Sequence, residues 1–162
     1  MSELSLPEPS VTDSSLAAPV APAALSRVIQ GSCLCGDVGY RFSGTPLRMV
    51  NCHCENCRRA RSAAYASNLF VTAKHFRWTR GEGQVVSYRL PGTPSFATAF
   101  CRRCGSDLPR VSRGEAVVVI PAGSLDGDPG LRPQAHICVG EKASWYEITD
   151  DLPQYSEMPP GV

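Results

Sequence analysis

The chain has 162 residues, of which 43% are hydrophobic, and a formal net charge of +1. A chain of this length is expected to form one small domain around a single core, and so balanced a charge gives no sign of the strongly basic face that a nucleic-acid-binding protein normally has. The opening residues, MSELSLPEPSVTDSS, lack the basic and apolar regions of a signal peptide. Gly, Pro and charged residues also interrupt every apolar run before it reaches the roughly 20 residues of a membrane span. We therefore expect a cytoplasmic protein that binds neither nucleic acid nor membrane.

Residues 1–26 contain four prolines and six serines, but no aromatic residue and no sustained helical or strand period. A segment of this composition cannot bury enough apolar surface to order its backbone. A short helix in SLAAPVAPAAL is the alternative, although Pro19 and Pro22 disfavour a continuous helix there. The sequence predicts a disordered tail over residues 1–26 and one folded domain over residues 27–162.

From Arg27 onward the segments are short, rich in β-branched and aromatic residues, and separated by turn sequences such as RGEG and DGDPG. Single helical turns are expected near residues 57–60, after Thr72 and around Ala143. The pattern predicts a mostly β fold, with strands at residues 38–42, 47–51, 64–71, 76–78, 84–90, 95–100, 116–122 and 135–139.

Two cysteine pairs, in SCLCG and FCRRCG, lie far apart in the sequence. Clustered cysteines in a protein without a secretory signal indicate a metal rather than disulfides. A structural zinc takes four ligands in a tetrahedron, and two short chelating turns supply them. The neighbouring Gly36 and Gly105 suit turns that need a positive φ angle. We expect a structural zinc that ties the start of the domain to its later half, held by Cys33, Cys35, Cys101 and Cys104.

The segment NCHCENCRRA, residues 51–60, contains Cys52, Cys54 and Cys57 without an obvious fourth ligand. Three protein ligands and one open position distinguish a catalytic zinc from a structural one. A zinc ion with three thiolates carries a net charge of −1, so it is better suited to holding an incoming thiol as a thiolate than to polarising a carbonyl. We expect these three cysteines to form a catalytic zinc site, which gives two zinc ions per chain.

Two other residues could close this second site. His53 lies between two of the ligands, a position that directs its side chain away from the metal they chelate. Cys138 lies in the apolar, strand-like run HICVG, where a single cysteine usually packs as a small hydrophobic residue. If either side chain binds the metal, both zinc ions are structural.

Arginines follow the three cysteines directly. Arg58, Arg59 and Arg61 could offset the negative charge of the site or bind the carboxylates of an anionic substrate. The alternative is a solvated basic face. Arg102 and Arg103, inside the other cysteine turn, are expected on the surface.

Six segments occur in a characteristic order: GSCLCGDVGYRF, NCHCENCRRA, FCRRCGSDLP, GSLDGDP, AHICVGEKASWYEI and DDLPQYSEMPP. In this order they resemble the glutathione-dependent formaldehyde-activating enzyme family, which includes the domain of centromere protein V. The resemblance covers residues 28–159. It implies a Mss4-like, or β-tent, zinc-stabilised β-sheet fold with few helical turns, and a carbon–sulfur lyase activity that condenses formaldehyde and glutathione into S-hydroxymethylglutathione. By position it also implies the division into a four-cysteine structural zinc site and a three-cysteine catalytic one.

The leading hypothesis is therefore a zinc enzyme that adds a small thiol such as glutathione to an aldehyde such as formaldehyde, or cleaves the adduct. Zinc would bring the thiolate close to the carbonyl and raise its population, because a free thiol with a pKa near about 8.5 is only slightly ionised at neutral pH. The proton for the developing alkoxide would come from water, Tyr65 or an arginine. Two alternatives belong to other classes: a non-catalytic zinc-stabilised module that binds a protein partner, and a thiol–metal redox sensor.

Overall fold

The computed structural model describes residues 27–159 apart from 95, 113 and 115, so the tail predicted over residues 1–26 lies outside the described residues. The strands are β1 (Val28–Ser32), β2 (Gly39–Ser43), β3 (Arg48–Cys52), β4 (Ala66–Thr72), β5 (Phe76–Arg80), β6 (Val85–Arg89), β7 (Ala97–Cys101), β8 (Arg110–Val111), β9 (Val117–Pro121) and β10 (His136–Ile137). The helical elements are α1 (Glu55–Arg61) and the 3₁₀ turns η2 (Ala73–His75), η3 (Glu82–Gln84), η4 (Ala122–Ser124) and η5 (Val139–Glu141).

The predicted fold class is confirmed: the chain is mostly β, with short helical elements and two clusters of cysteines, as in a Mss4-like zinc-stabilised fold. Strands β1 and β8 were not expected from the sequence. The strand expected over residues 135–139 is shorter, because β10 ends at Ile137 and Cys138 takes a left-handed conformation with φ 57°. The helical turn expected around Ala143 lies slightly earlier, at η5.

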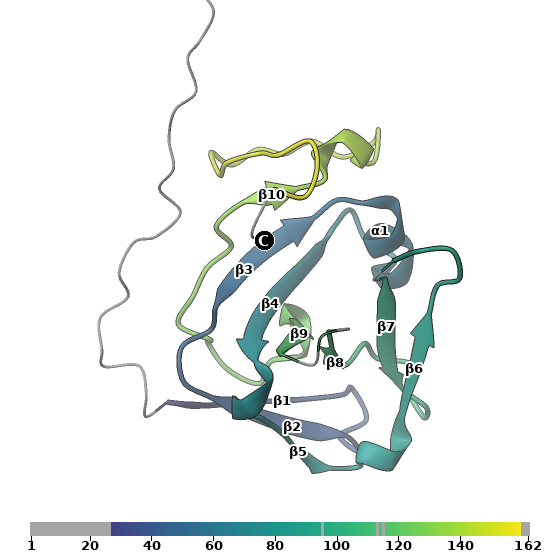
Figure 1. Cartoon of the computed structure of the whole chain (residues 1–162), viewed down its shortest axis with the longest axis vertical. Coiled ribbons are helices and arrows are strands. Elements are labelled where there is room, and N and C mark those ends of the chain that lie inside the picture. The colour runs from purple at the N-terminus through teal and green to yellow at the C-terminus, as the bar shows by residue number, and fades with distance from the viewer. Residues whose placement is uncertain (1–26, 95, 113, 115, 160–162) are drawn as a thin grey trace, which may run out of the picture.

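Three sheets make up the fold (Figure 1). One has the strand order β1-β2-β5, the second has the order β10-β3-β4-β9-β8, and the third is the hairpin β6-β7. Strand β10 pairs in parallel with β3, whereas the other strand pairs are antiparallel. Figure 1 shows α1 between the end of β3 and the hairpin, and the chain after β10 lying over that same end.

The main core lies between the first two sheets. Strand β1 buries alternate residues, as expected for a strand that faces a core on one side, and β2 and β4 each bury more than every second residue. Tyr40 crosses the neighbouring strand at Gly31 and hydrogen-bonds to the Ser124 hydroxyl at 2.7 Å. A Cβ atom at Gly31 would lie 2.2 Å from the Tyr40 ring, so glycine is required there. The buried members of this core are Ile29, Tyr40, Phe42, Met49, Leu69, Val71, Phe76, Val118 and Ile120.

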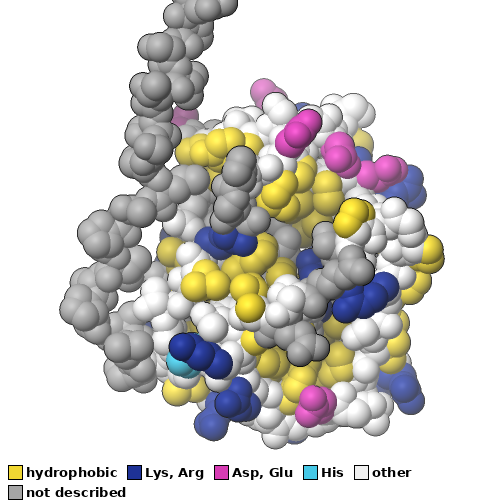
Figure 2. Space-filling model, viewed as in Figure 1, with side chains coloured by type: hydrophobic (Ala, Val, Ile, Leu, Met, Phe, Trp, Pro, Cys, Tyr) yellow, Lys and Arg dark blue, Asp and Glu magenta, His cyan; other side chains and the backbone are white. Residues whose placement is uncertain are grey.

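Charged side chains are unevenly distributed over the surface. On the face in Figure 2, acidic side chains gather along the upper edge, over the C-terminal part of the chain, while Lys and Arg side chains form separate groups. Arg102 and Arg103 are exposed, as expected, and Arg103 pairs with Asp37 at 2.8 Å. Within the described part of the chain, no helix has the length and apolar character needed to cross a membrane.

Candidate metal centres and active site

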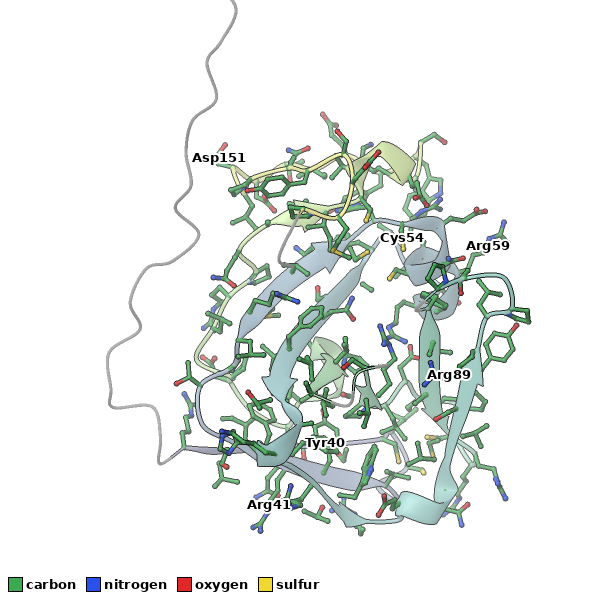
Figure 3. The ribbon with its side chains drawn as sticks, in the orientation of Figure 1. Tyr40, Arg41, Cys54, Arg59, Arg89 and Asp151 are labelled. Carbon is green, nitrogen blue, oxygen red and sulfur yellow. The ribbon has the colours of Figure 1, made fainter. Side chains whose placement is uncertain are left out.

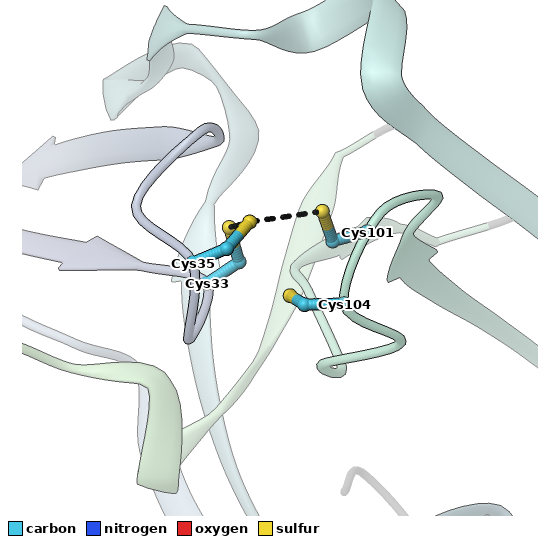
Figure 4. Close-up of side chains that lie close together, drawn as sticks. All are labelled: Cys33, Cys35, Cys101 and Cys104. Carbon is cyan, nitrogen blue, oxygen red and sulfur yellow. Dashed lines mark hydrogen bonds between the residues drawn. The ribbon is translucent and has the colours of Figure 1, made fainter.

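The two distant cysteine pairs meet in one cluster, in which the four side chains face one another from two loops (Figure 4). Their sulfur atoms all lie within 4.8 Å of one another, with 3.4 Å between Cys33 and Cys35 and 3.9 Å between Cys35 and Cys101. A tetrahedral site with zinc–sulfur bonds of about 2.3 Å places its sulfur atoms about 3.8 Å apart. The four-cysteine cluster therefore fits a metal ion.

Each of these loops is shaped by a glycine with a positive φ angle, as the sequence predicted. Gly36 has φ 78° and its N–H donates to the Cys33 carbonyl at 2.9 Å, while Gly105 has φ 73° and donates to the Cys101 carbonyl at 2.9 Å. A residue with a Cβ atom rarely adopts this conformation. The Val38 N–H also donates to the Cys33 sulfur at 3.3 Å, which favours a thiolate there.

The three-cysteine cluster is built by a change from strand to helix. Cys52 ends β3, Cys54 is the N-cap of α1, and Cys57 lies in the first turn of that helix. The Cys54 sulfur accepts the Cys57 N–H at 3.4 Å, as a capping side chain does. This short path brings the three sulfur atoms within 4.8 Å of one another, so the cluster offers three ligands to a metal ion.

The electrostatics of the thiols are compatible with a cation at this cluster. Hydrogen bonds with Cys54 and Cys57 raise the pKa of the Cys52 thiol far above its usual range. Hydrogen bonds from Cys52 and Cys57 lower the pKa of Cys54 to about 2. One thiolate is therefore stabilised by two neighbouring thiols, and ionising the others at such distances requires a positive charge among them.

Neither of the two residues considered as a fourth ligand belongs to the group of sulfur atoms within 4.8 Å of one another. The His53 ring contacts His136, and its Nε2 lies 2.7 Å from Nδ1 of His136. Cys138 is half-buried just after β10 and lies beside Cys52; burial raises the pKa of its thiol, and a hydrogen bond with Cys52 opposes that effect. Cys138 is thus the neighbouring thiol of the cluster rather than part of it.

The three arginines after the cluster have different environments. Arg58 donates from Nε to the His53 carbonyl at 3.2 Å. Arg59 is 76% exposed, pairs with a carboxylate of its own helix and points away from the molecule (Figure 3). Arg61 is 15% exposed and pairs with Asp107 at 2.6 Å. Arg59 therefore belongs to a solvated surface, as in the alternative considered above. Of the three arginines, Arg61 is the one that lines a cleft.

That cleft has a volume of about 680 Å³, within the range of small-molecule sites. It lies between the two cysteine clusters: Cys33 of the four-cysteine cluster forms part of one wall. On the other wall are Arg61, from the helix that carries Cys57, with Tyr65 and Ala66 at the start of β4. Ala66 is the register partner of Cys52. Cys52, Cys54 and Cys57 do not line the cleft themselves, and the cleft residue that interacts with them is Arg61, which acts electrostatically on Cys57.

A second arginine adds positive charge on the same side. Arg110, on β8, interacts electrostatically with Cys57 and Arg61, and burial lowers the pKa of its guanidinium. Among the described residues no carboxylate forms an ion pair with Arg110. Arg61 and Arg110 therefore both place positive charge near Cys57, and Asp107 already pairs with Arg61.

Two polar residues near the cluster, His136 and Asp150, were not identified from the sequence. His136 is 1% exposed, and its Nε2 lies 3.1 Å from both carboxylate oxygens of Asp150. Through its contact with His53, His136 connects Asp150 to the residue that lies between the candidate ligands Cys52 and Cys54. Burial lowers the pKa of His53 to about 4. The one signal in the sequence was a histidine inside the apolar run AHICV, which gives no information about its partners.

A model of the family described as glutathione-dependent formaldehyde-activating enzyme matches residues 28–141. Three chains of solved structure match, among them a Rhodobacter sphaeroides protein that is 24% identical, with a TM-score of 0.49; the match covers 61% of this chain and 89% of that one. No curated protein matches the chain. Because the family match spans most of the chain and includes both cysteine clusters, this chain belongs to the glutathione-dependent formaldehyde-activating enzyme family.

Proposed function

We propose that this chain is a zinc-dependent enzyme of the carbon–sulfur lyase type. It adds a small thiol such as glutathione to an aldehyde such as formaldehyde and cleaves the adduct in the reverse direction. The four-cysteine cluster holds a structural zinc ion, and Cys52, Cys54 and Cys57 hold a catalytic one. The observation that carries this proposal is a cluster of three sulfur atoms, without a fourth ligand in the group, next to Arg61, which lines a cleft of about 680 Å³.

The three cysteines leave one position of a tetrahedral site for a substrate. A zinc ion bound to them supplies the positive charge that keeps an incoming thiol ionised at neutral pH. The chain's own contribution is to fix three sulfur atoms on a strand end and a helix start, two rigid elements, so that the thiol is bound in one place.

Arg61 and Arg110 favour an anionic thiol over a neutral one. Both interact electrostatically with Cys57, and Arg61 also lines the cleft. Asp107 already pairs with Arg61, whereas Arg110 has no carboxylate partner among the described residues. A carboxylate of a peptide-like thiol would complete this arrangement with charge-assisted hydrogen bonds. This preference supports glutathione, which carries two carboxylates, as the first substrate to test.

The proposed reaction balances without an oxidant or reductant. The thiolate sulfur attacks the carbonyl carbon and a carbon–sulfur bond forms, while the π-electron pair of the carbonyl moves onto oxygen. The proton that the thiol lost to solvent is replaced at this oxygen, by water in the cleft or by the hydroxyl of Tyr65, which lines it. The product is a hydroxyalkyl thioether.

The direct test is the rate at which glutathione and formaldehyde reach equilibrium with their adduct, measured by exchange NMR on zinc-loaded protein. We expect a rate above the uncatalysed background that increases in proportion to protein concentration. Cysteamine, a thiol without carboxylates, serves as the matched substrate control and is expected to react more slowly. If no thiol in the panel reacts faster with protein than without it, the enzymatic proposal is wrong.

Metal content provides an independent prediction. The purified, reduced protein is expected to contain two zinc ions per chain, because seven of the eight cysteines form one four-ligand and one three-ligand cluster. The variant Cys138→Gly is expected to retain both ions, and glycine is the suitable replacement because residue 138 has φ 57°. Elemental analysis checks both proteins. One zinc ion in the variant would instead identify Cys138 as a ligand and close the site.

A further inference from the structure

Three polar side chains form a chain of hydrogen bonds from the surface to the three-cysteine cluster. Asp150 is 52% exposed, and both of its carboxylate oxygens lie 3.1 Å from Nε2 of His136. Nδ1 of His136 lies 2.7 Å from Nε2 of His53. Both histidines are buried, at 1% and 0% exposure, so water does not replace these contacts.

The direction of these hydrogen bonds follows from their donors and acceptors. An ionised carboxylate only accepts, so Nε2 of His136 carries the hydrogen and donates it to Asp150. With His136 neutral, only one of its ring nitrogens carries a hydrogen, so Nδ1 of His136 accepts from Nε2–H of His53. The second ring nitrogen of His53, Nδ1, is then left with a lone pair. It is buried and has no hydrogen-bond partner among the described residues; a charged His53 would bury an unpaired N–H group in its place.

His53 has little freedom to adopt another arrangement. Its backbone N–H donates to the Ile137 carbonyl at 2.9 Å, and its carbonyl accepts from Arg58 at 3.2 Å. Its ring packs against Tyr65 and Tyr146, with centroid distances of 5.1 and 5.9 Å. Strand β10 therefore holds the backbone of His53, and His136 holds its side chain.

We propose that Asp150 is a positioning residue for the three-cysteine site. Through His136 it holds His53 with its hydrogen on Nε2, and it thereby fixes the peptide that carries Cys52 and Cys54. A polar group that orients a metal site from outside its ligands commonly changes metal affinity by about 10- to 100-fold when it is lost. The consequence for catalysis rests on the function proposed above, whereas the hydrogen-bond direction and the metal affinity do not.

The variant Asp150→Asn tests this proposal because asparagine reverses the donor at the surface end of the chain. Oδ1 of Asp150 also accepts the Leu152 N–H at 3.0 Å, so the asparagine oxygen keeps that position and its NH₂ group faces His136. Oδ1 also lies 3.1 Å from Nε2 of His136 and can still accept, but the NH₂ group that replaces Oδ2 meets the Nε2–H donor at the same distance. The tautomer with its hydrogen on Nε2 therefore loses one of its two acceptors, and the hydrogens of both buried histidines are expected to move, at least in part, to Nδ1.

Nitrogen-15 NMR of histidine-labelled, zinc-loaded protein distinguishes the two tautomers. In the wild type, Nε2 of His53 and of His136 should show the N–H signature, and in Asp150→Asn this signature should shift to Nδ1. The exposed His75 provides an internal reference. Asp151→Asn is the matched control, because Asp151 is exposed and points away from the molecule (Figure 3).

Chelator competition on the same proteins measures the affinity of each zinc ion. Asp150→Asn is expected to bind one of its two zinc ions about tenfold more weakly, at the lower end of such effects, and Asp151→Asn should match the wild type. Unchanged histidine tautomers in Asp150→Asn would overturn the proposed chain. Reversed tautomers with unchanged zinc affinity would overturn the positioning role. If both readouts change in a protein that catalyses no thiol–aldehyde reaction, the proposed function fails and this inference stands.

Discussion

Cys101→Ser is expected to leave the chain largely unfolded at ambient temperature, with less than one tightly bound zinc ion. In the four-cysteine cluster, metal-binding energy is also folding energy, because the ligands come together only in the native chain. Structural zinc contributes about 10–16 kcal/mol in small zinc-binding peptides, compared with a net stability of about 5–15 kcal/mol for whole domains. The cluster joins Cys35 to Cys101, 66 residues apart, so its loss also releases a long loop.

Circular dichroism, the dispersion of backbone NMR signals and zinc content together check this result. Arg102→Ser is the matched control, since it introduces the same residue one position further along the same turn at an exposed site. It should fold like the wild type and retain both zinc ions. A Cys101→Ser protein that melts within a few degrees of the wild type would show that this cluster is not the structural centre.

Cys54→Ser is expected to abolish at least 99% of the proposed activity, on the order of a 100-fold loss or more for a site of this kind, and to remove one zinc ion while the fold remains. The three cysteines lie within one short segment, so the metal closes only a small loop and adds little to the stability of the chain. Serine also preserves the cap of α1, because its hydroxyl accepts the Cys57 N–H as the sulfur does.

Activity, zinc content and thermal unfolding are to be measured on the same preparation. Arg59→Gln is the control from the same helix: the side chain is exposed and its ion pair with Glu55 is worth little, so activity and both zinc ions should remain. The decisive comparison is with Cys101→Ser. If the two serine variants lose the same amount of stability, the division into a structural and a catalytic cluster is wrong.

The strands illustrate which parts of the fold were predictable. Segments such as residues 117–120, a run of β-branched residues bounded by turns, show their strand character locally. Strand β1 contains glycine and glutamine, and it forms because β2 pairs with it and the Tyr40 ring lies over Gly31. The two-residue strand β8 exists through its pairing with β9. These strands depend on partners that no local pattern reveals.

In the candidate site, too, some features were predictable from the sequence and others were not. The sequence by itself determined that seven cysteines group as four and three, because metal ligands on short turns impose fixed spacings that are visible in the chain. It also determined the positive φ angles of Gly36 and Gly105, which follow from the turns those ligands require. Such features depend on neighbours a few residues away.

Only the tertiary structure decided the environment of the three-cysteine cluster. His53 meets His136 across 83 positions of sequence, and Arg61 reaches Asp107 from another element. Cys138, expected to pack within a strand, instead follows the end of β10 in a left-handed conformation beside Cys52. Contacts of this kind arise when sheets pack, and the free energy that selects them is shared over the whole core, so no short stretch of sequence specifies them.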